Sequence, residues 1–263
     1  MRILHVGDIV GKPGRRIVEK AIPLLRDRLQ LDFVIANGEN SAGGSGLNAA
    51  NYQELIRAGV DCITPGDHIY RRSDIFGVMQ SEKKIVRPAN YPDDAPGIAW
   101  TVLEAADGTK VAVFGLMGRV FMKPVDCPFR AADRVLSEIP DDVKIKMVDF
   151  HAEATSDKQL MGQYLNGRVT SVLGTHTHVT TADEQILSKG TAFQCDIGMT
   201  GPHDSILGRR VDRVLETTIT FLPTFFDVAT NDVRLNATLV EADSESGKAL
   251  SVERICFRES ELD

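Results

Sequence analysis

Two histidines separated by one residue, His176 and His178, follow an apolar run at 169–173. Such a run is typical of a buried strand, so the pair is expected where this strand passes into a loop. In extended chain, side chains at i and i+2 lie on the same side, roughly 6 to 7 Å apart. That separation would let each imidazole bind a different member of a metal pair whose ions lie about 3.5 to 4 Å apart. His-x-His alone is weak evidence, because buried histidines also have structural roles.

Other side chains that bind metals also come directly after stretches that favour strands. These stretches lie at 3–6, 33–36, 60–64 and 145–149. The full set is Asp8, Glu39, Asn40, Asp67, His68, His151, His176 and His178. Since the loops after the carboxyl ends of strands converge at one edge of an open α/β sheet, we expect these residues to meet.

The chemistry of this set points to metal ions bound through oxygen and nitrogen. Carboxylate, carboxamide and imidazole groups without a thiolate suit Mn, Fe or Zn, and they argue against a sulfur-bound structural zinc. A carboxylate such as Glu39 or Asp67 can bridge two cations. A metal pair generates hydroxide near neutral pH and binds both the attacking and the leaving oxygen of an in-line displacement. The pattern therefore predicts a dinuclear centre for hydrolysis at phosphorus. The structural alternatives are that Asp8 caps a helix and that the histidines are buried and hydrogen-bonded.

Alternating strands and helices are predicted to position these residues. Helices are expected at 15–30, 49–58, from about 73, at 130–138 and at 156–165, the last opened by a capping box at 156–159. A hairpin is expected from 101–104 and 110–114, and further strands at 169–173, 191–195, 217–221, 233–241 and 250–257. Because no repeat, low-complexity tract or linker interrupts the pattern, we expect residues 1–263 to form a single domain.

Composition excludes several classes of protein. The 263 residues are 43% hydrophobic, enough for one large core or two small ones. A net charge of −7 argues against binding to duplex nucleic acid, which requires clustered Lys and Arg. No stretch approaches the roughly 18 apolar residues of a membrane span, and Met1 leads into a predicted strand without a signal peptide. The cysteines form no Cys-x-x-Cys pair, which suits a reducing compartment. We expect a cytoplasmic protein with no membrane contact.

Short motifs around the candidate ligands resemble those of a known superfamily, the calcineurin-like metallophosphoesterases. They are Gly7-Asp8, Gly38-Glu39-Asn40, Gly66-Asp67-His68, His151 and Gly174-Thr175-His176-Thr177-His178. A longer set is similar to the bacterial YmdB-like family within it: Gly7-Asp8-Ile9-Val10-Gly11, Gly38-Glu39-Asn40, His151-Ala152-Glu153-Ala154-Thr155-Ser156, residues 174–184 and Asp196-Ile197-Gly198-Met199-Thr200-Gly201-Pro202. Together these motifs run from residue 7 to about residue 202.

The resemblance implies a fold and a set of ligands. The fold would be an α/β sandwich of αββα type, with two central mixed β-sheets flanked by helices. Two divalent or mixed-valence ions are implied, with Fe or Mn favoured and Zn or Mg as alternatives. One ion would be held by Asp8, Glu39, Asn40 and His178. The other would be held by Glu39, Asp67, His151 and His176, with Glu39 bridging the two.

The resemblance also implies a reaction. Members of the family act on phosphodiesters and open 2′,3′-cyclic nucleotides at the 2′ bond to give 3′-nucleotides. Metal-bound hydroxide would attack phosphorus, and His68, facing the substrate phosphate, would act as the general acid for the leaving oxygen. The implied partner is therefore a small phosphodiester or cyclic nucleotide. Members are described as oligomers, so a homo-oligomer is expected.

The sequence departs from the family pattern at two places. The superfamily's usual Gly-Asn-His is here Gly66-Asp67-His68, which adds a negative charge facing the phosphate, and residues 69–72 replace the expected Thr-Trp-Asp. Substrate preference is therefore open: the alternatives are a broad phosphodiesterase or phosphomonoesterase, or a regulatory metal-binding protein with low turnover. Also open are the glycine loop at 43–46, as turn or phosphate cradle, the arginines at 71–72, as solvated residues or substrate clamp, and His203.

Overall fold

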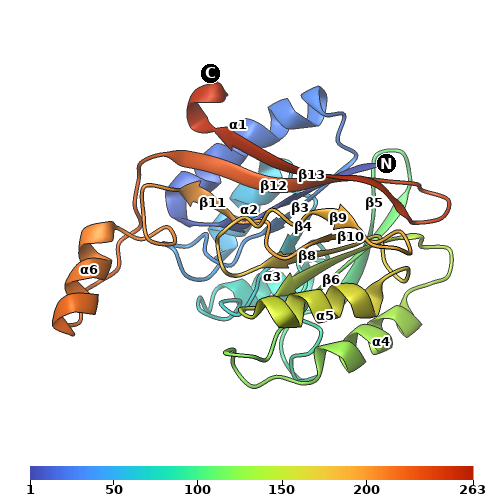
Figure 1. The fold of residues 1–263 in the computed structure, drawn as a ribbon, viewed down its shortest axis with the longest axis horizontal. Helices are drawn as coiled ribbons and strands as arrows, with labels where there is room; N and C mark the ends of the chain where they lie inside the picture. The colour runs from blue at the N-terminus through green and yellow to red at the C-terminus, as the bar shows by residue number, and fades with distance from the viewer. Residues whose placement is uncertain (263) are drawn as a thin grey trace.

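The computed structural model describes residues 1–262 and contains two β-sheets packed face to face with helices on the outer faces (Figure 1). The seven-stranded sheet has the order β2 (Asp8–Ile9), β11 (Met199–Pro202), β12 (Val233–Ala242), β1 (Arg2–Val6), β3 (Phe33–Asn37) and β4 (Cys62–Thr64), with β13 (Ala249–Arg258) paired to β12. The six-stranded sheet has the order β5 (Trp100–Glu104), β6 (Lys110–Met117), β7 (Ile145–His151), β8 (Ser171–Thr175), β10 (Ala192–Gln194) and β9 (Gln185–Ile186). Both sheets are mixed, and the predicted sandwich fold is confirmed.

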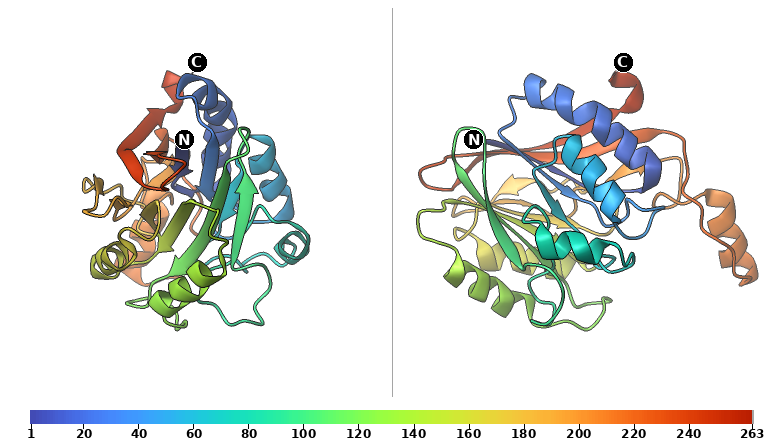
Figure 2. Two further views of the ribbon diagram at one scale, coloured as in Figure 1. Left: turned by 90° about the vertical axis from the view of Figure 1, so that its right-hand side faces the viewer. Right: turned by 180° about the vertical axis from the view of Figure 1, so that it is seen from behind.

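Helices cover each sheet on the side that faces away from the other sheet (Figure 2). The seven-stranded sheet packs against α1 (Gly11–Arg28), α2 (Ala49–Arg57) and α3 (Ile75–Ser81), and the six-stranded sheet against α4 (Pro128–Glu138) and α5 (Thr155–Leu165). Alternation along β1 sends Leu4 toward the helices and Ile3 toward the second sheet. The layer between the sheets is apolar and takes residues from both, including Phe33 and Met147. None of the helices in residues 1–262 is long and apolar enough to cross a membrane.

Parallel strands aim the predicted ligands at one end of the sandwich. In the first sheet β1, β3 and β4 run parallel, and in the second β6, β7, β8 and β10 do. The loops that follow these parallel strands therefore all lie at the same edge of their sheet. Two sheets contribute to one site because their packed faces place both edges together.

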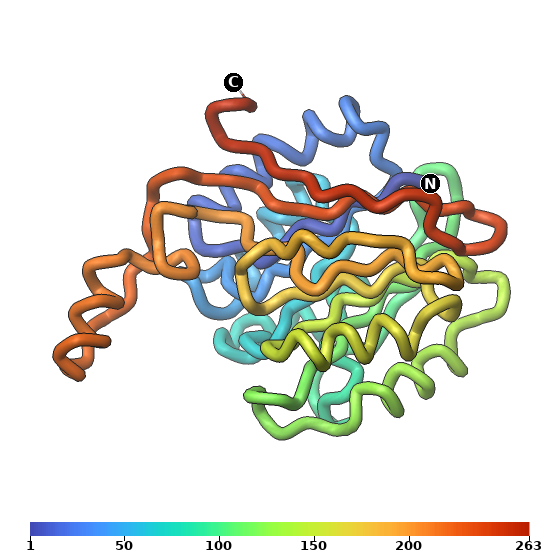
Figure 3. The backbone as a smooth tube through the Cα atoms, viewed as in Figure 1, coloured from blue at the N-terminus to red at the C-terminus, as the bar shows by residue number. Residues whose placement is uncertain are grey.

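The region after residue 205 differs from the prediction. Residues 217–221, predicted as a strand, form the end of helix α6 (Val211–Thr220), which extends away from the two sheets (Figure 3). Threonines and Ile219 favoured a strand locally, but the spacing of Val211, Leu215 and Ile219 is helical. Phe221, at a φ of 58°, ends the helix in the left-handed region. No α6 residue is buried.

Several boundaries also differ. Helix α1 begins at Gly11 rather than residue 15, and α5 begins at Thr155, with Ala154 as its N-cap. Ser156 therefore lies inside the first turn, and the predicted capping box is wrong. The short strands β2, β9 and β11 were not predicted, since two to four residues carry too little alternation to be recognised.

A close backbone approach beneath the histidine loop depends on glycine. A Cβ at Gly174 would overlap the carbonyl oxygen of Cys195, in the segment that follows β10. The Ile197 N–H donates to the Gly174 carbonyl at 2.9 Å, so the two segments are joined at this point. Glycine here lets β8 and the segment after β10 lie close enough to support the loop that carries His176 and His178.

We expect Gly174→Ala to lower the free energy of unfolding by about 1–3 kcal/mol, because the methyl group must force these segments apart. Gly77→Ala is the matched control: Gly77 lies in α3 with open space around it, and alanine there should be neutral or stabilise by up to about 1 kcal/mol. Urea unfolding followed by circular dichroism measures both. Equal stability of the two variants would contradict the close approach.

Candidate metal centre

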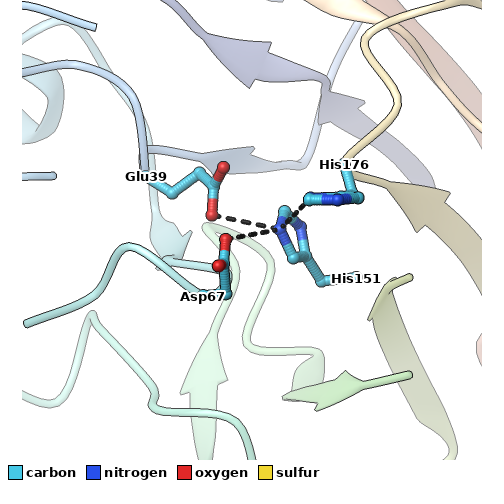
Figure 4. A group of neighbouring side chains, drawn as sticks. All are labelled: Glu39, Asp67, His151 and His176. Carbon is cyan, nitrogen blue, oxygen red and sulfur yellow. Dashed lines mark hydrogen bonds and ion pairs between the residues drawn. The ribbon is translucent and has the colours of Figure 1, made fainter. Parts of the chain in front are cut away.

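The polar residues that follow the strand ends meet in two overlapping groups. Glu39, Asp67, His151 and His176 each offer one ligand atom, and these atoms lie within 4.8 Å of one another. Asp8, Glu39 and His178 form a second such group, so Glu39 belongs to both. Figure 4 shows the first group, with Glu39 and Asp67 pointing toward His151 and His176 from the opposite side. Residues from both sheets therefore converge on Glu39.

Each member of the first group is delivered by the end of a different strand. Glu39 comes two residues after β3 and Asp67 three residues after β4, both in the seven-stranded sheet. His151 is the last residue of β7 and His176 the first after β8, both in the six-stranded sheet. The geometric expectation that strand ends would gather these side chains is met.

The two histidines of the His-x-His motif are not in extended chain, contrary to the prediction. Both lie in the loop after β8, with φ values of 99° for His176 and 65° for His178. Left-handed backbone at these two positions turns the side chains in different directions. As a result His176 enters the first group and His178 the second.

His151 is the centre of the first group. Its Nε2 lies 3.1 Å from Oε2 of Glu39, 3.6 Å from Oδ1 of Asp67 and 3.0 Å from Nδ1 of His176. The side chains of Glu39 and His151 are at most 2% exposed, whereas those of Asp67 and His176 are 14% and 25% exposed. The group is therefore buried on the Glu39 side and open to solvent on the Asp67 side.

Hydrogen bonds behind His151 fix which ring nitrogen faces the group. The Thr175 hydroxyl donates its hydrogen to Oδ1 of Asp149 at 2.6 Å. Because that hydrogen is used, Nδ1–H of His151 donates to the Thr175 oxygen at 2.8 Å. When the ring is neutral, as it is in a metal ligand, Nε2 carries no hydrogen and faces Glu39 and Asp67. This arrangement presents the lone pair of His151 to a cation.

Two carboxylate oxygens of the ligand groups are buried and lack a hydrogen-bond partner within residues 1–262. They are Oδ1 of Asp8 and Oδ1 of Asp67. The other oxygen of Asp8 accepts the His176 N–H at 3.1 Å. Buried carboxylate oxygens without donors are costly unless a cation compensates them. With an acid-and-imidazole ligand set around them, the residues present fit bound metal ions.

Asn40 and His68 lie at the edge of both groups. Nδ2 of Asn40 donates to Oε1 of Glu39 at 2.8 Å and lies 3.1 Å from Nε2 of His178. Oδ1 of Asn40 accepts Nδ1–H of His68 at 2.8 Å. Nε2 of His68 lies 3.8 Å from Oδ1 of Asp67. Asn40 thus links the second group to His68.

The acids and histidines of the two groups shift one another's pKa. Burial, and then Glu39, raises the pKa of Asp8 well above its usual range, although His151 opposes this. Burial alone would raise the pKa of Glu39, but His151 and His68 outweigh it and lower the pKa to about 2. Burial would lower the pKa of His151, yet Glu39 and Asp67 hold it well above the usual value. Positive charge is thus favoured where the carboxylates meet.

Comparison with known proteins identifies the family. A family model described as YmdB-like protein matches residues 4–255. The chain belongs to the YmdB-like family. It is 42% identical over 262 residues to the 2′,3′-cyclic-nucleotide 2′-phosphodiesterase of Bacillus subtilis (strain 168), covering 100% of this chain and 99% of that protein. The family predicted from the motifs is confirmed.

Two solved structures are similar to this YmdB-like chain over nearly its full length. A hypothetical protein from Thermus thermophilus is 42% identical with a TM-score of 0.92, over 98% of this chain and 100% of that one. A novel phosphatase from Mycoplasma pneumoniae is 32% identical with a TM-score of 0.91, over 98% of this chain and 93% of that one. The sandwich is thus a shared fold.

The residues whose roles the sequence left open have structural contacts in the YmdB-like chain. Arg72 donates to the carbonyls of Ala42 and Ser45, and Arg209 donates to those of Gly43 and Gly44, so two arginines bind the glycine loop at 43–46 through its oxygens. His203 donates from Nδ1 to the Gly201 carbonyl at 2.9 Å, and its Nε2 accepts from Asn236. His5 is fully buried within β1 and belongs to neither ligand group.

A buried ion pair that the sequence analysis did not assign supports the histidine loop. Nζ of Lys158 lies 2.7 Å from Oδ2 of Asp196, and both side chains are at most 3% exposed. Asp196 also accepts from the N–H and the hydroxyl of Thr177, between the two histidines, and from the Gly198 N–H. The carboxylate thereby holds the left-handed loop in place. Two signals in the sequence singled out Asp196, its position after the predicted strand 191–195 and its place at the start of the motif at 196–202, but neither indicated an ion pair.

Removing the Asp196 carboxylate should destabilise the protein strongly. Asp196→Ala strands the Lys158 ammonium in the interior and removes the loop's hydrogen bonds, so we expect a loss of about 3–5 kcal/mol. Lys158→Met should cost less, because the carboxylate keeps its three other donors. Chemical denaturation of the metal-free protein measures both losses.

Asp142→Ala provides the control for this experiment, since Asp142 pairs with Lys110 at the same 2.7 Å on the exposed surface. We expect little change in stability there. A cost for Asp196→Ala no greater than that for Asp142→Ala would show that the buried pair does not support the loop.

Proposed function

We propose that this protein is a metal-dependent phosphodiesterase that opens 2′,3′-cyclic nucleotides to 3′-nucleotides. The observation that carries the proposal is the pair of ligand groups sharing the buried carboxylate of Glu39. The name of the Bacillus subtilis relative supports the substrate class. The word phosphatase in the description of the Mycoplasma pneumoniae structure keeps a broader phosphoesterase as the second candidate.

The residues that would hold the ions divide as the two groups do. Asp8, Glu39 and His178, with Asn40 beside them, would hold one, and Glu39, Asp67, His151 and His176 the other. Fe or Mn is favoured, and Zn or Mg would also fit a set of oxygen and nitrogen ligands. A bound pair would supply an activated water near neutral pH and neutralise charge on the phosphate.

Asn40 couples this ligand role to the orientation of His68. In the structure Nδ2 of Asn40 faces Glu39 and His178. The NH₂ group of a side-chain amide is a hydrogen-bond donor and does not bind a cation. Turning the amide by 180° would direct Oδ1 toward these residues and Nδ2 toward Nδ1 of His68. His68 would then carry its hydrogen on Nε2. That is the form in which His68 can give a proton to the leaving oxygen.

Asp67 brings a negative charge where the superfamily pattern has a neutral asparagine. One of its oxygens faces His151 and the other lies 3.8 Å from Nζ of Lys123. Lys123 is 58% exposed, so solvent screens much of this attraction. In our proposal the metal ion offsets the Asp67 charge from one side, and Lys123 weakly offsets it from the other.

We also propose that residues 1–263 fold as one domain. Strand β12 from the carboxyl-terminal part pairs directly with β1, from Arg2↔Glu241 to Val6↔Ala237. The apolar layer between the sheets contains residues from both ends of the chain, including Ile3 and Val240. Separation into two units would break this sheet.

Protein purified without oxygen should contain two transition-metal ions per chain and convert 2′,3′-cyclic AMP to 3′-AMP. Removal of the ions with a chelator should abolish turnover, and Mn or Fe should restore it, because the chain's own groups cannot generate the nucleophile near pH 7. Metal analysis and chromatography of the products measure this. Loaded protein that ignores both cyclic nucleotides and bis-p-nitrophenyl phosphate would instead be a metal-binding regulator.

His68→Ala should lower kcat for 2′,3′-cyclic AMP by about 10²–10⁴-fold while metal content stays at the wild-type level. His176→Ala should lose metal as well as activity, because His176 belongs to a ligand group. His203→Ala serves as the histidine control outside both groups and should keep metal and turnover. Loss of metal from the His68 variant would make His68 a ligand or a support of the ligands and would argue against an acid role.

A further inference from the structure

A hollow of about 330 Å³ opens beside the candidate metal centre on its exposed side. Asp67 is part of its lining, so the hollow and the first ligand group share a residue. Its volume is at the lower end of the range of about 300–1,000 Å³ found for small-molecule sites. A phosphate held at the metal centre would therefore place the rest of its molecule in or near this hollow.

Two tyrosine rings form an apolar wall of the hollow. The rings of Tyr70 and Tyr91 pack against each other with centroids 6.0 Å apart and tilted by 52°. Tyr70 also packs against Phe76, and its hydroxyl donates to the carbonyl of Pro96 at 2.6 Å. These contacts hold the wall in place before any ligand binds. Both tyrosines are only partly buried, which leaves ring surface for a flat partner.

Cationic side chains complete the hollow. Arg71 and Lys123 both line it, in a chain whose net charge is −7. A hollow with an aromatic wall, cations and an edge at a metal centre fits a molecule that is flat at one end and anionic at the other. A nucleotide has this composition, since any base can stack on an aromatic ring while its phosphate attracts cations.

We propose that the hollow binds the nucleoside part of the substrate, with the base stacked on the wall formed by Tyr70 and Tyr91. This inference rests on the proposed phosphodiesterase function and adds the element that would favour nucleotides over other phosphodiesters. A second hollow of about 410 Å³, beside His178, is lined by Arg234 and Arg254 but contains no tyrosine, phenylalanine or tryptophan. It therefore offers charge without a comparable stacking surface.

Calorimetry with the metal-loaded protein tests the proposal through the affinities for 3′-AMP and for inorganic phosphate. The wild type should bind 3′-AMP at least about fivefold more tightly than phosphate, the lower end of what one base–aromatic stack contributes. Tyr91→Leu should remove at least about fivefold of that preference. Tyr91→Phe, which keeps the ring, should retain it. Tyr164→Leu makes the same change on α5, away from the hollow, and should also retain it.

Equal affinity of the wild type for the two ligands, or an unchanged preference in Tyr91→Leu, would overturn the proposal. Loss of the preference in Tyr91→Phe as well would assign recognition to the hydroxyl and would also contradict stacking. Metal content and circular dichroism show whether each variant keeps its site and its fold. If Tyr91→Leu does not, Tyr91→Met replaces it, and its preference for 3′-AMP over phosphate is compared with that of Tyr91→Phe. Binding is measured without turnover. A loaded protein that does not hydrolyse cyclic nucleotides would therefore contradict the proposed reaction, while the binding data would still test the role of the hollow.

Discussion

The structure depends on one electrostatic constraint, the gathering of carboxylates in a place that water barely reaches. Asp8 and Glu39 are at most 1% exposed, and Asp67 adds a third carboxylate at the edge. Buried charges of one sign are costly unless positive charge meets them. Within the protein alone, a proton on His151 supplies part of that charge, which is why its pKa is raised. Cations between the same groups would supply more, and would leave each imidazole free to act as a ligand.

The fold meets this constraint by using two sheets instead of one. The acids of the two groups come from the seven-stranded sheet and the imidazoles from the six-stranded sheet, so two kinds of candidate ligand face each other across the sandwich. Each imidazole then needs its own support. Thr175 and Asp149 orient His151, and Asp196 with Lys158 holds the loop of His176 and His178. Behind the ligands, therefore, lies a second set of buried polar groups that hold the ligands in position.

Local patterns predicted the alternation of strands and helices and the meeting of the polar residues, whereas the two-sheet sandwich was implied by the resemblance to the family. Apolar runs mark strands, and parallel strands deliver their following loops to a common edge. The sequence could not predict the supporting groups, since Lys158 and Asp196 are 38 residues apart and neither interrupts a pattern. The left-handed turns at His176 and His178 were also missed, because non-glycine residues rarely adopt that conformation and sequence alone gives no sign of it. Residues 217–221 were predicted as a strand because β-branched residues favour strands. The apolar residues of α6 are spaced as in a helix, but none of them is buried.

The candidate metal centre has one side that is buried and one side that is open to solvent. Glu39 and His151 are closed to solvent, while Asp67, His68 and His176 keep between 14% and 25% exposure. The hollow with the tyrosine wall opens on this same side, next to Asp67. In the proposed reaction a substrate would bring its phosphate to the candidate ligand groups without displacing the buried acids, so the exposed side is the one from which it would approach. His68 lies there, 2.8 Å from Asn40 and 3.8 Å from Asp67, so in the proposed reaction its proton would be delivered on the side from which the product returns to solvent.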